Sequence, residues 1–170
     1  MTPIDERRHL LEGPAREERP RGVGIVSITA KTHGDATSVL SRAQEVMRII
    51  VDCAGTPWPK PDEWRALLPE WFLAASGPER TTEEIEQWLR WWRSLPPDIS
   101  GRVEREQKWS LDDWLFWVDP KERQWFWWDG VIVDSNTARV EVDVPGWPTS
   151  LGAVEWLLRA AGAIEVDVDS

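Results

Sequence analysis

The sequence predicts an α+β fold in which one antiparallel sheet carries two helices on one face and a tryptophan-rich helical insertion. Two segments, 139–144 and 163–169, alternate apolar and charged residues, which is typical of strands with one buried face. Two others, 36–53 and 151–161, repeat apolar residues at helical spacing. The prolines of TPWPKP, which begins at Thr56, start a helical segment of different composition that extends to about residue 120.

The first 21 residues are predicted to form a disordered tail. They combine five acids, five arginines and three prolines with few large apolar side chains, so burial cannot offset the entropy lost on ordering. A segment that folds on a partner is the functional alternative. Residues 22–170 are long enough for one core, and we expect a single α+β domain that includes the helical insertion 56–120.

The first strand is predicted within residues 22–31, where small and β-branched residues alternate without a helical stripe. The turn THGD follows, and Asp35 is placed to cap the N-terminus of a helix. The apolar stripe of this helix extends to the neighbourhood of Cys53 and consists of Val39, Ala43, Val46 and Ile50.

The insertion is predicted to contain four helices. Two short ones begin at Pro61 and Pro69, a third follows the capping box of Thr81 and Glu84, and a fourth follows Ser110. The polar segment 98–108 between the third and fourth helices is expected to be a surface connection. Three tryptophans fall on helical stripes and are expected in the core: Trp88, Trp92 and Trp114.

The segment 109–134 holds six of the fourteen tryptophans. Its aromatic and β-branched residues favour a turn at 120–123 and a strand over 125–134 with a kink at Asp129–Gly130. The alternative is a fresh helix start at 119–122. With the insertion left out, the elements follow in the order strand, helix, strand, strand, helix, strand. This order resembles the split βαβ arrangement of ferredoxin-like folds, which implies four strands with both helices on one face.

Composition argues against several classes of function. The formal charge of −10 repels phosphate backbones, so we expect no nucleic-acid ligand. Cys53 is the only cysteine and no apolar stretch is long enough to span a bilayer, so we expect a cytoplasmic protein that does not bind membranes. His9 and His33 neighbour no nucleophile motif, and we expect no catalytic residue, no cofactor and no metal.

The leading hypothesis is a non-catalytic protein-interaction module. Residues 129–170 carry eight acids against two arginines. The predicted sheet places five of the carboxylates on the face opposite the helices: Glu141, Asp143, Glu165, Asp167 and Asp169. Like charges on neighbouring strands are destabilising, so a basic protein partner would relieve them. In this respect the chain is similar to small acidic immunity proteins, which neutralise basic toxins.

The alternative is a small-ligand or carbohydrate-binding domain with an aromatic cleft. Four tryptophans lie off the helical stripes or in a loop, and they are the candidates to stack a sugar ring or hold a cation: Trp91, Trp117, Trp127 and Trp147. Carboxylates near such a cleft would permit hydrolytic chemistry. Homodimerisation through a face or an edge of the sheet is compatible with either function.

Overall fold

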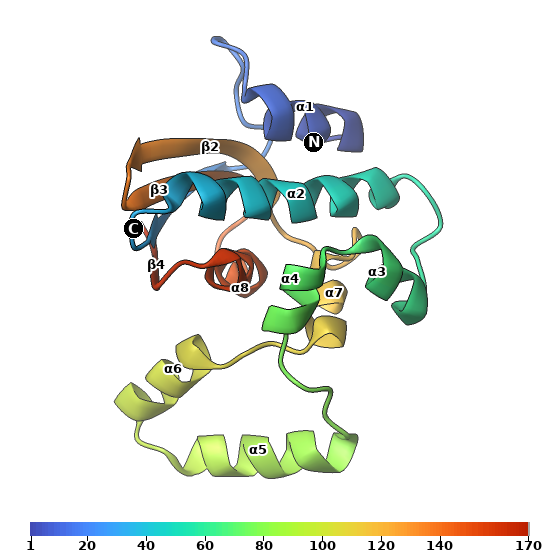
Figure 1. Ribbon diagram of the computed structural model, residues 1–170, viewed down its shortest axis with the longest axis vertical. Coiled ribbons are helices and arrows are strands. Elements are labelled where there is room, and N and C mark those ends of the chain that lie inside the picture. The colour runs from blue at the N-terminus through green and yellow to red at the C-terminus, as the bar shows by residue number, and fades with distance from the viewer. Residues whose placement is uncertain (170) are drawn as a thin grey trace.

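The computed structural model describes residues 1–169 and shows a mixed α+β architecture. Within those residues the chain forms eight helices and one four-stranded antiparallel sheet (Figure 1). The helices are α1 (Pro3–Glu12), α2 (Ala36–Ala54), α3 (Pro61–Leu67), α4 (Glu70–Ala75), α5 (Thr82–Ser94), α6 (Pro97–Glu106), α7 (Leu111–Val118) and α8 (Gly152–Ala161). The strands are β1 (Gly24–Lys31), β2 (Phe126–Asp134), β3 (Thr137–Val144) and β4 (Glu165–Val168).

The strands lie in the order β2-β3-β1-β4, and each strand is antiparallel to its neighbours. The prediction of an antiparallel four-stranded sheet is therefore confirmed. The aromatic segment forms strand β2 and not a helix. The pairing of β2 with β3 shifts register between Trp127 and Asp129, close to the kink predicted at Asp129–Gly130.

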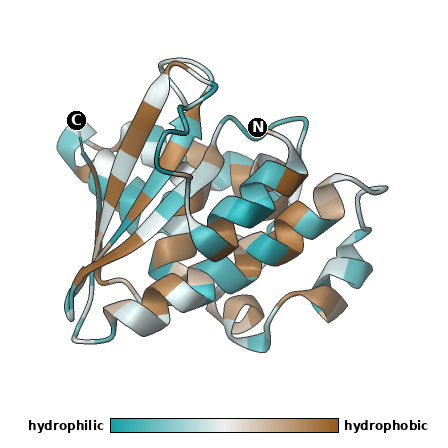
Figure 2. Cartoon of the chain, turned by 90° about the horizontal axis from the view of Figure 1, so that it is seen from above, coloured by the Kyte–Doolittle hydropathy of each residue, from teal (hydrophilic) through white to brown (hydrophobic). Residues whose placement is uncertain are grey.

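The core lies between the sheet and the helices α2 and α8. These two helices contact each other, α2 also contacts β2 and β3, and α8 also contacts β1 and β4. Apolar and polar residues alternate along the strands (Figure 2). Five of the residues that face the helices are fully buried: Ile28, Ala30, Ala138, Val140 and Val142. Each large apolar side chain buried in this way contributes about 1.5–3 kcal/mol relative to exposure.

The insertion divides into a packed part and an exposed part. Helices α3, α4 and α7 contribute Trp64, Phe72 and Trp114 to the core, and the indole N–H of Trp114 donates to the Ala153 carbonyl at 2.9 Å. Helices α5 and α6 form a hairpin at one end of the molecule, which we call the α5–α6 hairpin (Thr82–Glu106) (Figure 1). Neither helix contains a buried residue.

Two predictions for this hairpin are wrong. The polar segment 98–108 is mostly helix α6, because Pro97 occupies the first helical turn, where a missing N–H costs little. Trp88 and Trp92, expected in the core, are only half-buried. They stack on each other at 6.2 Å, and the indole N–H of Trp92 donates to the Ser100 carbonyl, so these contacts lie within the hairpin and not with the sheet.

The prediction of a disordered tail over residues 1–21 is also wrong, because residues 3–12 form helix α1, which packs against α2 and β2. Its Glu6 carboxylate is buried. It accepts hydrogen bonds from both terminal nitrogens of Arg123, at 2.6 and 2.8 Å, and from the backbone N–H of Trp127, at 2.7 Å. Composition predicted disorder because it contains no information on such a partner.

Candidate functional site

Four carboxylates gather on the sheet face opposite α2 and α8, and we call Glu141, Glu165, Asp167 and Asp169 the acidic face. Strand register carries them there: Asp167 is the neighbour of Thr29, and Thr29 alternates with the inward residues of β1. The three carboxylates at the C-terminal end are exposed, and Glu141 is half-buried. The sheet thus presents carboxylates from two different strands on one surface.

The acidic face holds more negative charge than the neighbouring cations neutralise. Lys31 pairs with Glu165 at 3.0 Å, and Arg139 pairs with Glu141 at 3.4 Å. The hydrogen bond from Lys31 lowers the pKa of Glu165. By contrast, the hydrogen bond and charge of Glu165 raise the pKa of Asp167. A second negative charge is therefore unfavourable at Asp167, and a cation placed there would be stabilised.

Asp143 does not belong to this surface, and its predicted exposure is wrong. Its carboxylate is buried and accepts hydrogen bonds from the backbone N–H groups of Arg21 and Gly22, both at 3.0 Å. The adjacent Val23 also donates its N–H to the Val144 carbonyl. Asp143 therefore anchors the segment that leads from α1 into β1, and its buried carboxylate is not exposed to a partner.

The four candidate tryptophans do not line one cleft. Trp127 is fully buried, because the register of β2 turns it toward the helices beside Val142. Trp91 is 50% exposed on α5, where it contacts Trp88, and Trp147 is 69% exposed in the loop after β3. Trp117 alone of the four lines the large pocket beside α8. The expectation that Trp127 contributes to an exposed cleft is therefore wrong.

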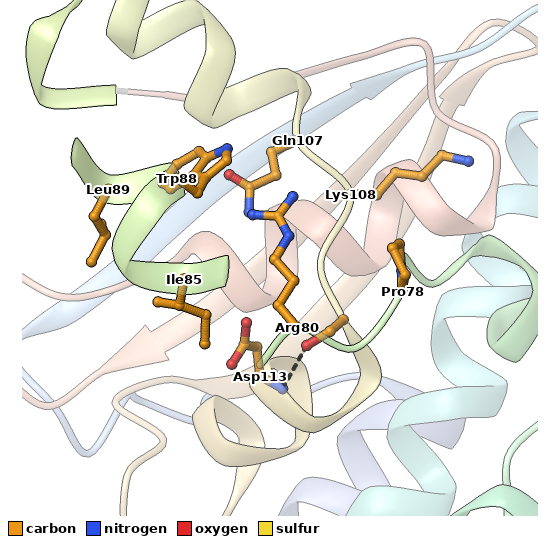
Figure 3. Close-up of a pocket in the computed structure, with 9 residues that line it drawn as sticks. Pro78, Arg80, Ile85, Trp88, Leu89, Gln107, Lys108 and Asp113 are labelled. Atoms are coloured by element: carbon orange, nitrogen blue, oxygen red, sulfur yellow. Dashed lines mark hydrogen bonds between the residues drawn. The ribbon is translucent and has the colours of Figure 1, made fainter. Parts of the chain in front are cut away.

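A small pocket lies where the α5–α6 hairpin meets the rest of the chain (Figure 3). Its volume is about 160 Å³, and its apolar wall is made by Ile85, Trp88 and Leu89 of α5. The Arg80 guanidinium lies over the Trp88 ring, 5.5 Å from its centroid, and occupies the aromatic face. Pockets for drug-sized ligands span roughly 300–1,000 Å³, so this one is too small for such a molecule.

A larger pocket of about 400 Å³ lies between α6 and α8, and we call it the α6–α8 groove. Sequence analysis singled out one residue of its lining, Trp117. The pair Glu155 and Arg159 gave the ordinary signal of an exposed i,i+4 pair, which does not reveal that α6 lies beside it. The lining consists of Glu104, Arg105, Trp109, Trp117, Ser150, Gly152, Glu155 and Arg159.

The part of the chain that the structure describes contains no group of three or more His, Cys, Asp or Glu side chains arranged to hold a metal ion. Desolvation by burial raises the pKa of the Cys53 thiol, which disfavours the reactive thiolate. His9 is buried and lies 2.8 Å from a Glu18 oxygen, edge-on to Trp128. Over residues 1–169, no helix has the length and apolar character needed to cross a bilayer.

Comparison of the chain with protein-family models, with curated proteins and with solved structures finds no match. The surfaces of this chain are therefore the only indication of its function. Two of them combine charge with exposure: the acidic face and the α6–α8 groove.

Proposed function

We propose that this chain is a non-catalytic interaction module of the cytoplasm whose acidic face binds a basic segment of a partner protein. The observation that carries the proposal is the surplus of exposed carboxylates on the acidic face, expressed in the raised pKa of Asp167 beside Glu165. Lysine or arginine side chains of a partner would relieve this repulsion and would steer the approach of the two proteins.

We further propose that the sheet with α2 and α8 is a ferredoxin-like unit. The strand order β2-β3-β1-β4 with antiparallel neighbours supports this assignment. So does the packing of α2 and α8 against each other and against the sheet. In such a unit the helices cover one face, and the opposite face is available to a partner. One partner of the required chemistry is a basic toxin, which this protein would neutralise in the way that small acidic immunity proteins neutralise theirs.

The proposal is tested with a short oligo-lysine peptide as the probe and isothermal titration calorimetry at low salt. The double variant Glu165→Gln with Asp167→Asn removes two charges from the acidic face. The matched control, Glu83→Gln with Glu86→Gln, removes two exposed charges from α5 and so has the same net charge as the face variant. We expect the face variant to bind roughly three- to tenfold more weakly, the range for losing two exposed ion pairs.

The control variant should retain the affinity of the unmodified protein within about twofold, since α5 does not belong to the proposed surface. Equal weakening in both variants would show that the peptide responds to net charge alone, and this result would contradict the proposal. Backbone amide shift changes on β1, β3 and β4 during the titration should place the peptide on the acidic face.

A further inference from the structure

The α6–α8 groove contains charges of both signs that are not paired with each other. Arg105 and Arg159 line it together with Glu104 and Glu155. Among the residues that the structure describes, none of these four takes part in an ion pair within 4.0 Å. The Nε atom of Arg159 is buried and has no hydrogen-bond partner. Unpaired groups of this kind are costly unless a ligand satisfies them.

The groove continues into a second pocket of about 200 Å³, which shares Arg105, Glu155 and Arg159 with the first. Burial raises the pKa of Glu155, opposed by the positive charges of Arg159 and Arg105 and reinforced by the negative charges of Glu104 and Asp167. Burial likewise lowers the pKa of Arg159. Both charged groups have therefore lost part of their hydration without gaining a partner in exchange.

Two tryptophans form the apolar wall of the groove. Trp109 lies directly on the first residue of α8: a Cβ atom added to Gly152 would come within 2.9 Å of the indole ring. Glycine at this position is thus what permits the indole to lie against the helix start. Trp117 is 37% exposed and lines the same pocket. An apolar group of a ligand could rest on these rings.

We propose that the α6–α8 groove binds a small zwitterion of the α-amino acid class. The carboxylate would lie between Arg105 and Arg159, the ammonium group would be directed to Glu155 and Glu104, and the side chain would rest on the tryptophans. Two guanidinium groups and two carboxylates make the formal charge of the 400 Å³ pocket zero, which matches a zwitterion better than a simple anion or cation. The volume of about 400 Å³ suits a ligand of this size.

The test uses three related probes: L-phenylalanine, its amide, which lacks the carboxylate, and its N-acetyl derivative, which lacks the ammonium group. Binding is measured by tryptophan fluorescence and by calorimetry. L-phenylalanine should bind roughly tenfold or more tightly than either blocked compound, because each blocked compound leaves one charged group of the groove without a partner. Its affinity should fall as the pH drops through the raised pKa of Glu155, because the protonated carboxyl no longer attracts an ammonium group.

Variants of the groove test which residues bind the carboxylate and which bind the ammonium group of the ligand. Arg105→Gln should weaken L-phenylalanine binding roughly tenfold while leaving binding of the amide unchanged. Glu155→Gln should weaken binding of L-phenylalanine and of its amide, both of which carry the ammonium group, while leaving binding of the N-acetyl derivative unchanged. Arg105 is exposed, so its replacement should not impair folding. Arg102→Gln, on the same helix but outside the lining, is the matched control and should bind like the unmodified protein. No binding of L-phenylalanine at millimolar concentration, or equal binding of all three probes, would overturn the proposal.

Discussion

Helices α1 and α5 are buried to an extent opposite to what their sequences suggest. Helix α1 is ten residues long and rich in charged side chains, yet Glu6, His9 and Leu10 are buried. Helix α5 is thirteen residues long, with Ile85 and three tryptophans among its apolar residues, yet none of its residues is buried. The helix that resembles a surface segment is docked, and the helix that resembles a core element is exposed.

The difference lies in the partners that each helix meets. Glu6 enters a site where Arg123 supplies a bidentate ion pair and strand β2 supplies a free N–H, so its desolvation is compensated. Arg123 itself lies over the rings of Trp125 and Phe126. The apolar stripe of α5 meets a small pocket and the other helix of its hairpin. A helical stripe therefore predicts that a helix forms, but it does not predict that the helix is buried.

The largest effect is expected from breaking the α1 contact. Glu6→Ala leaves Arg123 buried without its counter-charge, and the free energy of unfolding should fall by about 3–5 kcal/mol, or α1 should detach at a similar local cost. Urea denaturation with amide exchange distinguishes the two results. Glu12→Ala, an exposed position on the same helix, should change the free energy of unfolding by less than about 0.5 kcal/mol. Equal effects of the two substitutions would show that the buried pair does not hold α1 in place.

An intermediate effect on stability is expected from lowering the pH. Hydrogen bonds from Arg8, from the Ala15 N–H and from His9 lower the pKa of Glu18 from 4.5 to about 2. Its contribution to stability is therefore complete above about pH 4.5 and is lost as the pH falls through about 2. The fluorescence of Trp128, which His9 contacts, should report this loss. Glu18→Gln should abolish the transition, whereas Glu17→Gln should retain it; a transition that survives in Glu18→Gln must come from another group.

The smallest effect is expected in α5. Trp91→Ala should lower the free energy of unfolding by only about 1 kcal/mol, because half of the side chain is already exposed. Trp114→Ala, which empties a fully buried site in α7, should cost about 3–5 kcal/mol and serves as the reference. If Trp91→Ala cost as much as Trp114→Ala, then α5 would have to pack against another surface in solution.

The sheet could be predicted from the chain because its signals are local. The alternation of Val140 and Val142 with charged residues determines which face of β3 is buried, whatever the strand packs against. The same period predicted that Asp167 and Glu165 would be exposed. It failed at Asp143, because a distant segment, Arg21–Gly22, covers that end of the face.

The α6–α8 groove could not be predicted in the same way. The segment that forms α6 starts at the pair Pro96–Pro97 and has few apolar residues, so the sequence favoured a loop, and Arg105 had no assigned neighbour. Trp117 was recognised as lying off its helical stripe, which is a local property. Its proximity to Glu155 and Arg159 depends on how the helical insertion packs against α8, and no periodic pattern in the sequence predicts that packing.

Local periodicity and charge, read from the sequence alone, determined most of the helices, all four strands and the concentration of carboxylates on the closing strands. Each depends on interactions within a few residues or on simple alternation. Only the tertiary structure decided that Glu6 is buried, that α5 is not, and that Arg105 faces Arg159. These outcomes depend on contacts between segments far apart in the chain, where a single suitably placed counter-charge determines whether a polar helix can be buried.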